Sequence, residues 1–149
     1  MKLLNNALLS VFVKAGEDEN KITEKLKSFV PLDFEEEKLA VKRQTAEGFE
    51  DKKMVILEIE LEREKHTNAF LKELDSKLES GQKELLIRQA ESRLDGEFNF
   101  FMRLDKDRLL DENKYWVTDS GNCFHIKMNI ACFPRKRDVA LGIIQNIFK

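Results

Sequence analysis

Two segments near the end of the chain alternate between apolar and polar residues. Every even position from Phe98 to Leu104 is apolar, and the even positions from Phe124 to Cys132 repeat the pattern. Because successive side chains of a β-strand point to opposite faces of its sheet, this period of two predicts two half-buried strands. We therefore expect a sheet with one covered face and one open face.

After the second strand, the pattern changes to that of a helix. Apolar residues recur at helical spacing from Ala140 to Ile147, behind a short charged segment. Proline is favoured as the first residue of a helix, because its fixed φ suits that position and its missing N–H would have no partner there. We expect the last helix to begin at Pro134, which would place the basic residues that follow it in the first helical turn.

Earlier segments predict three further strands and the helices between them. The expected strands cover residues 7–15, 38–44 and 54–62; the expected helices cover 22–30, 64–79 and 82–94, with a loop over 46–52 and a helical turn over 105–113. The order β-α-β-β-α-α-β-β-α, with short connections between neighbouring strands, predicts an α+β fold. We expect a two-layer sandwich with a largely antiparallel sheet and its helices on one face.

Size and charge limit the classes of function. With 149 residues, 42% of them hydrophobic, the chain is long enough for a core of its own, and we expect a single domain over residues 1–149. The 26 basic and 28 acidic residues give a net charge of −2. Bulk charge therefore argues against a general polycation that binds nucleic acids, so only local basic clusters matter.

The cysteines and the N-terminal segment indicate the compartment. Cys123 and Cys132 lie on one predicted strand, whose extended geometry separates them by about 30 Å and prevents a disulfide. Free cysteines are typical of a reducing compartment. The first apolar run is interrupted by Asn5 and Asn6, unlike a signal peptide or a membrane span. We expect a cytoplasmic protein without a membrane partner.

Motifs in the last third of the chain resemble a known family. Arg103-Leu104-Asp105-Lys106 ends an aromatic strand, and the strand from Ile126 to Ala131 leads into Pro134-Arg135-Lys136-Arg137. These motifs resemble the "RLDKQ" strand end and the closing "VRIKI…YP" corner of small archaeal RNA-binding proteins that are predicted exosome subunits. The similarity extends over nearly the whole chain, although Asp107 replaces the usual Gln and residues 48–51 lack the frequent "HGNP" motif.

The resemblance has implications for both fold and function. It implies a fold similar to that of the large-subunit ribosomal protein that holds 5S RNA, an antiparallel sheet backed by helices. It also implies RNA binding and a link to the exosome in RNA processing.

The open face of the expected sheet is one candidate RNA site. If the apolar positions point toward the helices, the opposite face carries Phe12, Lys14, Ile56, Phe101, Arg103, His125 and Lys127. Such surfaces bind single-stranded RNA by stacking bases on aromatic rings and pairing phosphates with cations. Glu58 and Glu60 would share the face and repel phosphates. A face covered by a dimer partner or a loop, with Phe12, Ile56 and Phe101 as buried contacts, is therefore the alternative.

The basic corner before the last helix is a second candidate. Cations at a helix N-terminus meet the positive end of the helix dipole, at a cost of about 0.3–1 kcal/mol each, unless an anion such as an RNA phosphate binds there. The cluster consists of Arg135, Lys136 and Arg137, extended by Arg103, Lys106 and Arg108. The alternatives are a solvated corner balanced by nearby acids and, for the second group, ion pairs with Asp105 and Asp107.

A catalytic or metal site has little support in the sequence. Asp105, Asp107 and His125 carry groups that suit a magnesium site, but alternate residues of an extended segment point to opposite faces. The chain has no glycine-rich phosphate loop, nucleophile elbow or Cys/His zinc motif. We expect neither enzymatic activity nor a cofactor.

Together these observations predict a non-catalytic RNA-binding accessory protein of archaeal type, with exosome components among its expected partners. The expected RNA contacts are Phe12, Phe101, Arg103, Lys106, Arg108, Lys127, Arg135, Lys136 and Arg137. The alternative is a protein-interaction module or homodimer that uses the open sheet face and does not bind RNA by itself.

Overall fold

A computed structural model describes residues 2–47 and 53–149 of the chain. In this part of the chain, five strands form one sheet in the order β2-β3-β1-β5-β4, each antiparallel to its neighbours. The strands are β1 (Leu4–Val13), β2 (Lys42–Glu47), β3 (Lys53–Leu61), β4 (Asn99–Asp105) and β5 (Cys123–Ile130). The helices are α1 (Glu19–Lys27), α2 (Glu64–Lys77), α3 (Ser80–Arg88), α4 (Ala90–Arg93), α5 (Lys106–Glu112) and α6 (Arg137–Phe148).

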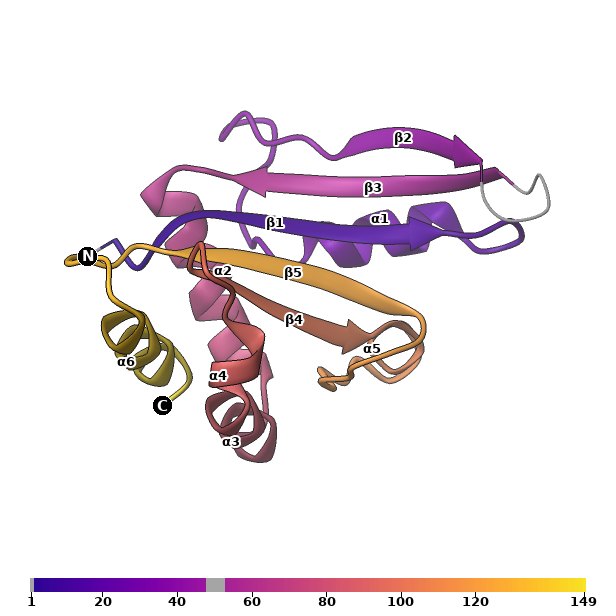
Figure 1. Cartoon of the computed structure of the whole chain (residues 1–149). Helices are drawn as coiled ribbons and strands as arrows, with labels where there is room; N and C mark the ends of the chain where they lie inside the picture. Colours follow the sequence, from indigo (N-terminus) through magenta and orange to yellow (C-terminus); the bar gives the residue numbers. More distant parts are fainter. Residues whose placement is uncertain (1, 48–52) are drawn as a thin grey trace.

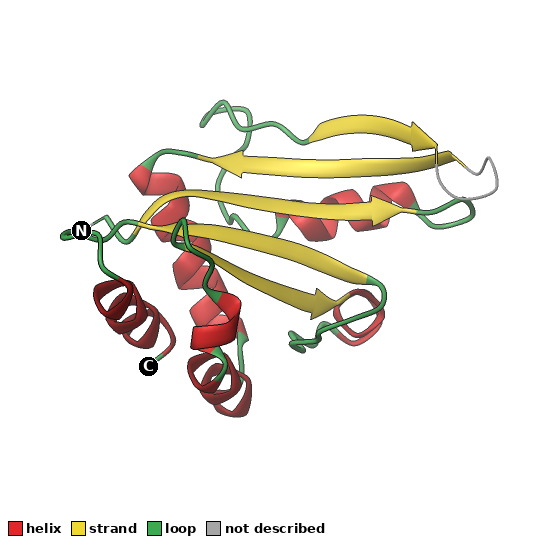
Figure 2. Cartoon of the chain, in the orientation of Figure 1, coloured by secondary structure: helices red, strands yellow, loops and turns green. Residues whose placement is uncertain are grey.

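The helices lie on one side of the sheet and leave the other side uncovered (Figure 1, Figure 2). This arrangement confirms the expected α+β sandwich of two layers with an antiparallel sheet. Residues 48–52 of the expected loop, which include the segment compared with the "HGNP" motif, lie outside the described residues.

Alternate residues face the helices in β1 from Ala7 to Val13, in β4 from Phe100 and in β5 from Phe124, as the alternation predicts. Val11 of β1 and Phe124 of β5 are fully buried on this side. Phe29, which follows α1, joins the layers, because its ring centroid lies 5.7 Å from those of Tyr115 and Phe124 and 6.4 Å from that of Phe70. Truncating a buried aromatic side chain of this kind typically costs about 3–5 kcal/mol, so these contacts hold the sheet firmly against its helices.

The second strand and the helix expected over 82–94 differ from the observed elements. β2 begins at Lys42 rather than at residue 38, because Lys38 has a φ of 58° and the N–H of Leu39 turns to bond the carbonyl of Phe34 at 2.8 Å. The helix expected over 82–94 is divided into α3 and α4. Gln89, with φ −97° and ψ 9°, leaves helical geometry between them.

The last helix begins at Arg137, so the expectation of three basic residues in its first turn is wrong. Pro134 follows a cis peptide bond with Phe133 and lies in a turn, in which its carbonyl accepts a hydrogen bond from the N–H of Lys136 at 2.8 Å. Lys136 is the N-cap, and its carbonyl accepts the bond from the N–H of Ala140 at 3.1 Å. The proline therefore precedes the helix instead of opening it.

Candidate functional site

The register of the sheet places aromatic and basic side chains side by side on the uncovered face. Phe101 of β4 pairs with Lys127 of β5, and Arg103 of β4 pairs with His125 of β5. Phe12 of β1 packs edge-on against His125, with ring centroids 6.0 Å apart. We call these five residues the aromatic–basic patch. Their shared face is the one that the alternation predicts.

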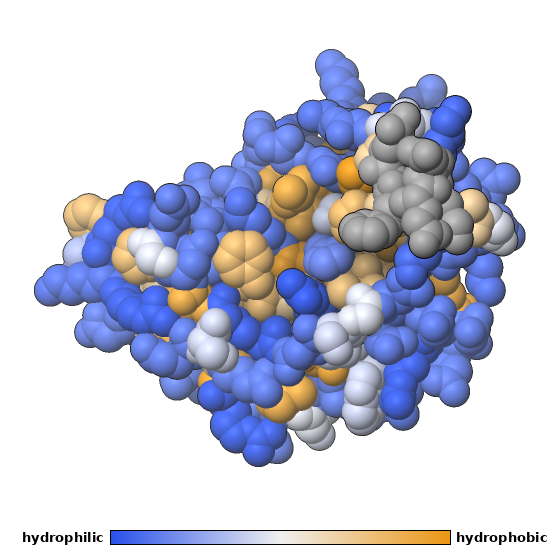
Figure 3. All heavy atoms as spheres, turned by 45° about the vertical axis from the view of Figure 1, so that its right-hand side comes forward, coloured by the Kyte–Doolittle hydropathy of each residue, from blue (hydrophilic) through white to orange (hydrophobic). Residues whose placement is uncertain are grey.

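The patch is open to solvent. Phe101 is 42% exposed and Phe12 is 39% exposed, whereas the residues flanking them along each strand are buried. In one view of the molecular surface, hydrophobic side chains gather in the middle and hydrophilic side chains surround them (Figure 3). Exposed aromatic rings beside cations can stack nucleobases and pair with phosphates at the same time.

The strand order separates the basic residues of the patch from the acidic residues of the same face. Glu58 and Glu60 lie on β3, where they pair with Ser10 and Leu8 of β1, so β1 stands between them and β5. Two strand spacings amount to about 10 Å, roughly one Debye length at physiological salt. Lys42 of β2 partly balances these acids, with its Nζ 3.8 Å from Glu60. The expected repulsion of phosphates therefore falls mainly on the other half of the sheet.

His125 of the patch and Cys123 next to it are uncharged at neutral pH. Burial, and then the nearby charge of Arg103, lower the pKa of His125. Burial raises the pKa of the Cys123 thiol, whose Sγ lies 3.6 Å from Nε2 of His125. Cys123 and Cys132 are both free. The positive charge of the patch therefore comes from Arg103 and Lys127.

Lys127 also has an acidic neighbour. Burial would raise the pKa of Asp95, but hydrogen bonds from the backbone and side chain of Asn99, then one from the backbone of Glu97 and the charge of Lys127, lower it. Asp95 is thus engaged with backbone groups of the turn before β4. Its carboxylate weakens the positive field of Lys127 without forming an ion pair with it among the described residues.

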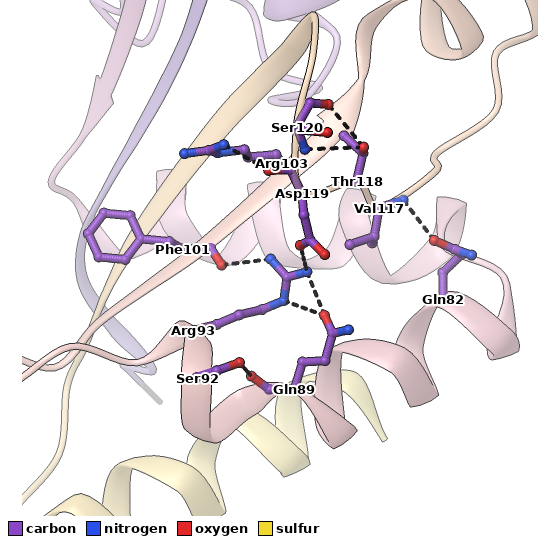
Figure 4. Close-up of polar contacts among 10 residues, drawn as sticks. All are labelled: Gln82, Gln89, Ser92, Arg93, Phe101, Arg103, Val117, Thr118, Asp119 and Ser120. Carbon is purple, nitrogen blue, oxygen red and sulfur yellow. Dashed lines mark hydrogen bonds and ion pairs between the residues drawn. The ribbon is translucent and has the colours of Figure 1, made fainter.

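A hollow of about 410 Å³ adjoins the patch beside β4, the edge strand. It is lined by Gln89, Ser92, Arg93, Phe101, Arg103 and Asp119. Figure 4 shows the guanidinium of Arg93 between the side chains of Gln89 and Asp119 and the carbonyl of Phe101, whose ring points away from it. Arg93 donates to Oε1 of Gln89 at 2.6 and 3.0 Å and to the Phe101 carbonyl at 3.3 Å, and it lies 2.8 Å from Oδ1 of Asp119.

Two predicted RNA contacts have other partners. Lys106 is 1% exposed, and its Nζ donates to the Phe12 carbonyl at 2.6 Å and to Glu17 at 2.8 Å. The prediction that it contacts RNA is therefore wrong for this structure, since a buried ammonium group cannot reach a phosphate. Arg108 is exposed and stacks on Trp116 at 4.5 Å from the ring centroid. The prediction that Arg108 contacts RNA stays open, because a guanidinium stacked on an aromatic ring keeps its N–H groups free for hydrogen bonds.

The basic corner does not act as one cluster. The guanidinium of Arg137 donates to the backbone carbonyls of Glu91 at 2.6 Å and of Leu94 at 3.0 Å, at α4 and its C-terminal end. It also donates to the side-chain carboxylate of Glu91 at 3.1 Å. The guanidinium of Arg135 lies over the ring of Phe98, 5.0 Å from its centroid. Lys136 remains exposed at the helix cap. Phe98 itself precedes β4 and has a φ of 66°, so its expected place within the strand is also wrong.

Two residues with functional potential were not singled out by the sequence pattern. Arg93 lies near the end of a predicted amphipathic helix, and only the Gln89 four residues before it hints at a fixed guanidinium. Phe133 is 95% exposed next to Pro134 and the basic corner. As an odd position at the end of the alternating segment it lies opposite the apolar even positions, so the period of two was a signal for its exposure.

The groups considered for a metal site are not gathered into one. Asp105 caps α5, where its side chain accepts from the N–H of Arg108 at 3.0 Å, and His125 faces Phe12. In the described part of the chain, no group of three or more His, Cys, Asp or Glu side chains is placed to hold a metal ion. None of the helices in the described ranges has the length and apolar content of a membrane span.

A comparison with known protein families matches the part of the chain that forms the sheet. A family model described as RNA binding matches residues 6–130. The match ends at the last residue of β5, so it contains the aromatic–basic patch and the hollow but neither the basic corner nor α6.

Relatives extend over almost the whole chain. The RNA-binding protein PAB1135 from Pyrococcus abyssi is 22% identical over 142 residues, which cover 95% of this chain and 91% of that protein. The uncharacterized protein MJ0213 from Methanocaldococcus jannaschii is 27% identical over 141 residues, 90% of this chain and 89% of that protein. The solved structure of Mth689, a DUF54 protein from Methanothermobacter thermautotrophicus, shares the fold with a TM-score of 0.78 at 26% identity, and the match covers 99% of this chain and 100% of that one.

Proposed function

Because this chain belongs to the RNA-binding family, we propose that it binds single-stranded RNA on the aromatic–basic patch and does not itself cleave the RNA. The observation that carries the proposal is the pairing of exposed Phe101 with Lys127, beside Arg103, on a sheet face that no helix covers. Bases would stack on Phe101 and Phe12 while Arg103 and Lys127 pair with the phosphates. Single strands fit best, because a duplex keeps its bases stacked on one another.

The extent of the family match supports the patch over the basic corner. The matched residues end at Ile130, before the corner begins. Arg137 is also committed to the α4 carbonyls, which leaves Arg135 and Lys136 as peripheral contacts in this proposal. They would extend the path of the RNA backbone rather than anchor it.

The proposed role is binding without catalysis. Asp105 is used as a helix cap, and burial keeps His125 uncharged beside an aromatic ring, so neither group is placed as an acid or base toward a common reacting atom. A labelled oligonucleotide incubated with the protein and Mg²⁺ should remain intact. Magnesium-dependent cleavage that co-purifies with the folded protein would contradict this part of the proposal.

An accessory role beside the exosome is the finer part of the proposal. It is supported by the resemblance of the strand-end motif at Arg103 to the corresponding family motif and by the absence of a catalytic arrangement at the patch. A reconstituted archaeal exosome passed over the immobilised protein, with and without RNA, tests the link. Retention in both conditions supports direct contact, and no retention in either condition excludes it.

The RNA proposal is tested with a fluorescein-labelled oligouridine and fluorescence anisotropy. Wild-type affinity should fall as salt rises, with a slope of about 0.7 in log Kd per log salt for each phosphate neutralised on a single strand. Phe101→Ala should weaken binding by about 1–3 kcal/mol, the usual contribution of one base stacked on an aromatic ring. No binding at low salt would exclude the proposal.

Phe34→Ala is the matched control. Phe34 is half-buried on the helix side, and Nζ of Lys27 lies 5.1 Å from its ring centroid, so it is also an aromatic ring next to a lysine. Its partner Lys27 belongs to α1, one of the helices on the covered side of the sheet (Figure 1). An equal loss of affinity in both variants would indicate general damage rather than a lost stacking contact.

The exposed rings also favour a second candidate, a homodimer through the same face. Phe101 and Phe12 offer apolar area that a second copy could bury. Light scattering decides between the two roles. A dimer that Phe101→Glu dissociates, together with no RNA binding, would support the interaction module, and a monomer that binds RNA supports the proposal above.

A further inference from the structure

We propose that the hollow beside β4 is a nucleotide subsite, in which an RNA phosphate takes the place of the Asp119 carboxylate on Arg93 and the attached nucleoside lies toward Phe101. This inference rests on the proposed function and names the part of the site that takes one nucleotide. The hollow and the patch share Phe101 and Arg103, so a strand that crosses the patch can enter the hollow directly.

The guanidinium of Arg93 is fixed before any ligand binds. Oε1 of Gln89 accepts two of its hydrogen bonds, at 2.6 and 3.0 Å, and the Phe101 carbonyl accepts a third at 3.3 Å. These partners belong to the protein framework on α3–α4 and β4. A guanidinium held in this way has already lost its rotational freedom, so an anion that binds it pays less entropy.

Asp119 is the exchangeable partner. Its side chain is 78% exposed, whereas that of Arg93 is 10% exposed, so the carboxylate lies between the guanidinium and solvent. Carboxylates and phosphates accept hydrogen bonds from guanidinium groups in similar geometry, and the phosphate carries more acceptor oxygens. The carboxylate therefore occupies the position that an RNA phosphate would take.

The carboxylate can leave while its backbone stays in place. Nη1 of Arg103 donates to the carbonyl of Asp119 at 3.0 Å, and the N–H of Thr118 donates to the carbonyl of Arg103 at 2.9 Å. The hydroxyl of Thr118 donates to the carbonyl of Ser120 at 3.1 Å. These bonds hold the loop from both sides of Asp119, so a rotation of one side chain is enough to expose Arg93.

The size and charge of the hollow suit a single nucleotide. Its volume of about 410 Å³ lies within the range of small-molecule sites, roughly 300–1,000 Å³. Two guanidinium groups face one carboxylate among its lining residues, which leaves a net positive charge. Phe101, 42% exposed at the boundary with the patch, offers a face for the base.

The test is Asp119→Asn in the same oligouridine binding assay. The amide keeps the size of the side chain but no longer competes for Arg93 as an anion, so affinity at low salt should rise roughly two- to fivefold, the usual size of an exposed ion-pair effect. The dependence on salt should stay close to that of wild type, because the same phosphate contacts Arg93 in both proteins. Arg93→Gln in the Asp119→Asn background should remove the gain in affinity and flatten the dependence on salt by about 0.7 in log Kd per log salt, because one phosphate contact is lost.

Asp75→Asn is the matched control. Asp75 also forms an ion pair at 2.8 Å, with Lys83, and its side chain is 50% exposed, but it lies on α2 away from the hollow. The same loss of one negative charge there should leave affinity and salt slope within error of wild type. A gain of equal size in both variants would show a general charge effect and overturn the subsite.

The outcomes separate this inference from the proposed function. Wild-type binding with no gain in Asp119→Asn overturns the subsite and leaves RNA binding on the patch intact. No binding by wild type or by Asp119→Asn overturns both. Because Asp119→Asn changes only an exposed side chain, the test does not depend on whether the Arg93→Gln variant folds.

Discussion

The ammonium group of Lys106 lies 2.8 Å from Oε1 of Glu17, although the side chain of Lys106 is only 1% exposed. The same ammonium group donates to the carbonyl of Phe12 at 2.6 Å. Lys106 is the first residue of α5, Phe12 is the patch residue on β1, and Glu17 lies in the turn before α1. One buried cation thus joins three segments and fixes the backbone beneath one of the two exposed rings.

Replacing this cation should destabilise the fold. Lys106→Met keeps most of the aliphatic volume but removes the ammonium group from the Phe12 carbonyl and from Glu17, which keeps only the N–H of Lys14. The expected cost is roughly 1–3 kcal/mol in the free energy of unfolding. Urea denaturation measures the difference. Lys21→Met is the control, because Lys21 pairs with Asp111 at 3.6 Å on the surface and such pairs contribute about 0–1 kcal/mol. Equal stability of the two variants would contradict a structural role for Lys106.

The same contact predicts a pH dependence of stability. Burial alone would raise the pKa of Glu17, but hydrogen bonds from Lys106 and from the backbone N–H of Lys14 lower it below its ordinary value of 4.5. The folded state therefore binds this proton less readily than the unfolded state. The resulting stabilisation is present above the ordinary value and is lost as the pH falls through the lower, folded-state pKa.

The variant Glu17→Gln tests the direction of this pH dependence. Its free energy of unfolding should decrease less than that of wild type between about pH 6 and pH 3, because the amide does not titrate. Denaturant titrations at several pH values give the comparison. Parallel stability curves for the two proteins would show that the proton uptake occurs at other carboxylates.

Arg137 should matter for stability more than for RNA. Its hydrogen bonds to the carbonyls of Glu91 and Leu94 join α6 to α4, and hydrogen bonds of a charged donor contribute about 1.5–3 kcal/mol each. Arg137→Ala should therefore lower the melting temperature clearly. Arg135→Ala should change it little, since Arg135 is exposed and only overlies the ring of Phe98. The opposite order of melting temperatures would contradict the assigned roles.

The face of each strand residue could be predicted from the sequence because it follows from local periodicity. Phe12, Phe101 and Arg103 point away from the helices as the alternation requires. The separation of the basic residues from Glu58 and Glu60 could not be predicted, since it depends on β1 being inserted between β3 and β5. Strand order is set by packing of the whole sheet and leaves no local pattern.

Two of the missed features depend on contacts between residues distant in the sequence. Lys106 is buried because Glu17, 89 residues away, provides a partner. Arg93 belongs to a site only because Asp119, 26 residues later, reaches it. At Pro134 the error is local: the rule that places proline at the start of a helix does not distinguish the first helical residue from a turn just before it.

The last prediction compares the basic half of the uncovered face, on β4 and β5, with its acidic half, on β2 and β3. Lys127→Ala and Arg103→Ala should each reduce RNA affinity and should each flatten the dependence of log Kd on log salt by about 0.7, because each removes one phosphate contact on a single strand. Lys42→Ala is the control on the same face, since Lys42 lies on β2 with its Nζ 3.8 Å from Glu60. It should leave the slope unchanged, as phosphates avoid the acidic half of the sheet. A slope that falls equally in all three variants would mean that RNA spreads over the whole face, and that the separation of charge between β3 and the β4–β5 pair does not direct the strand.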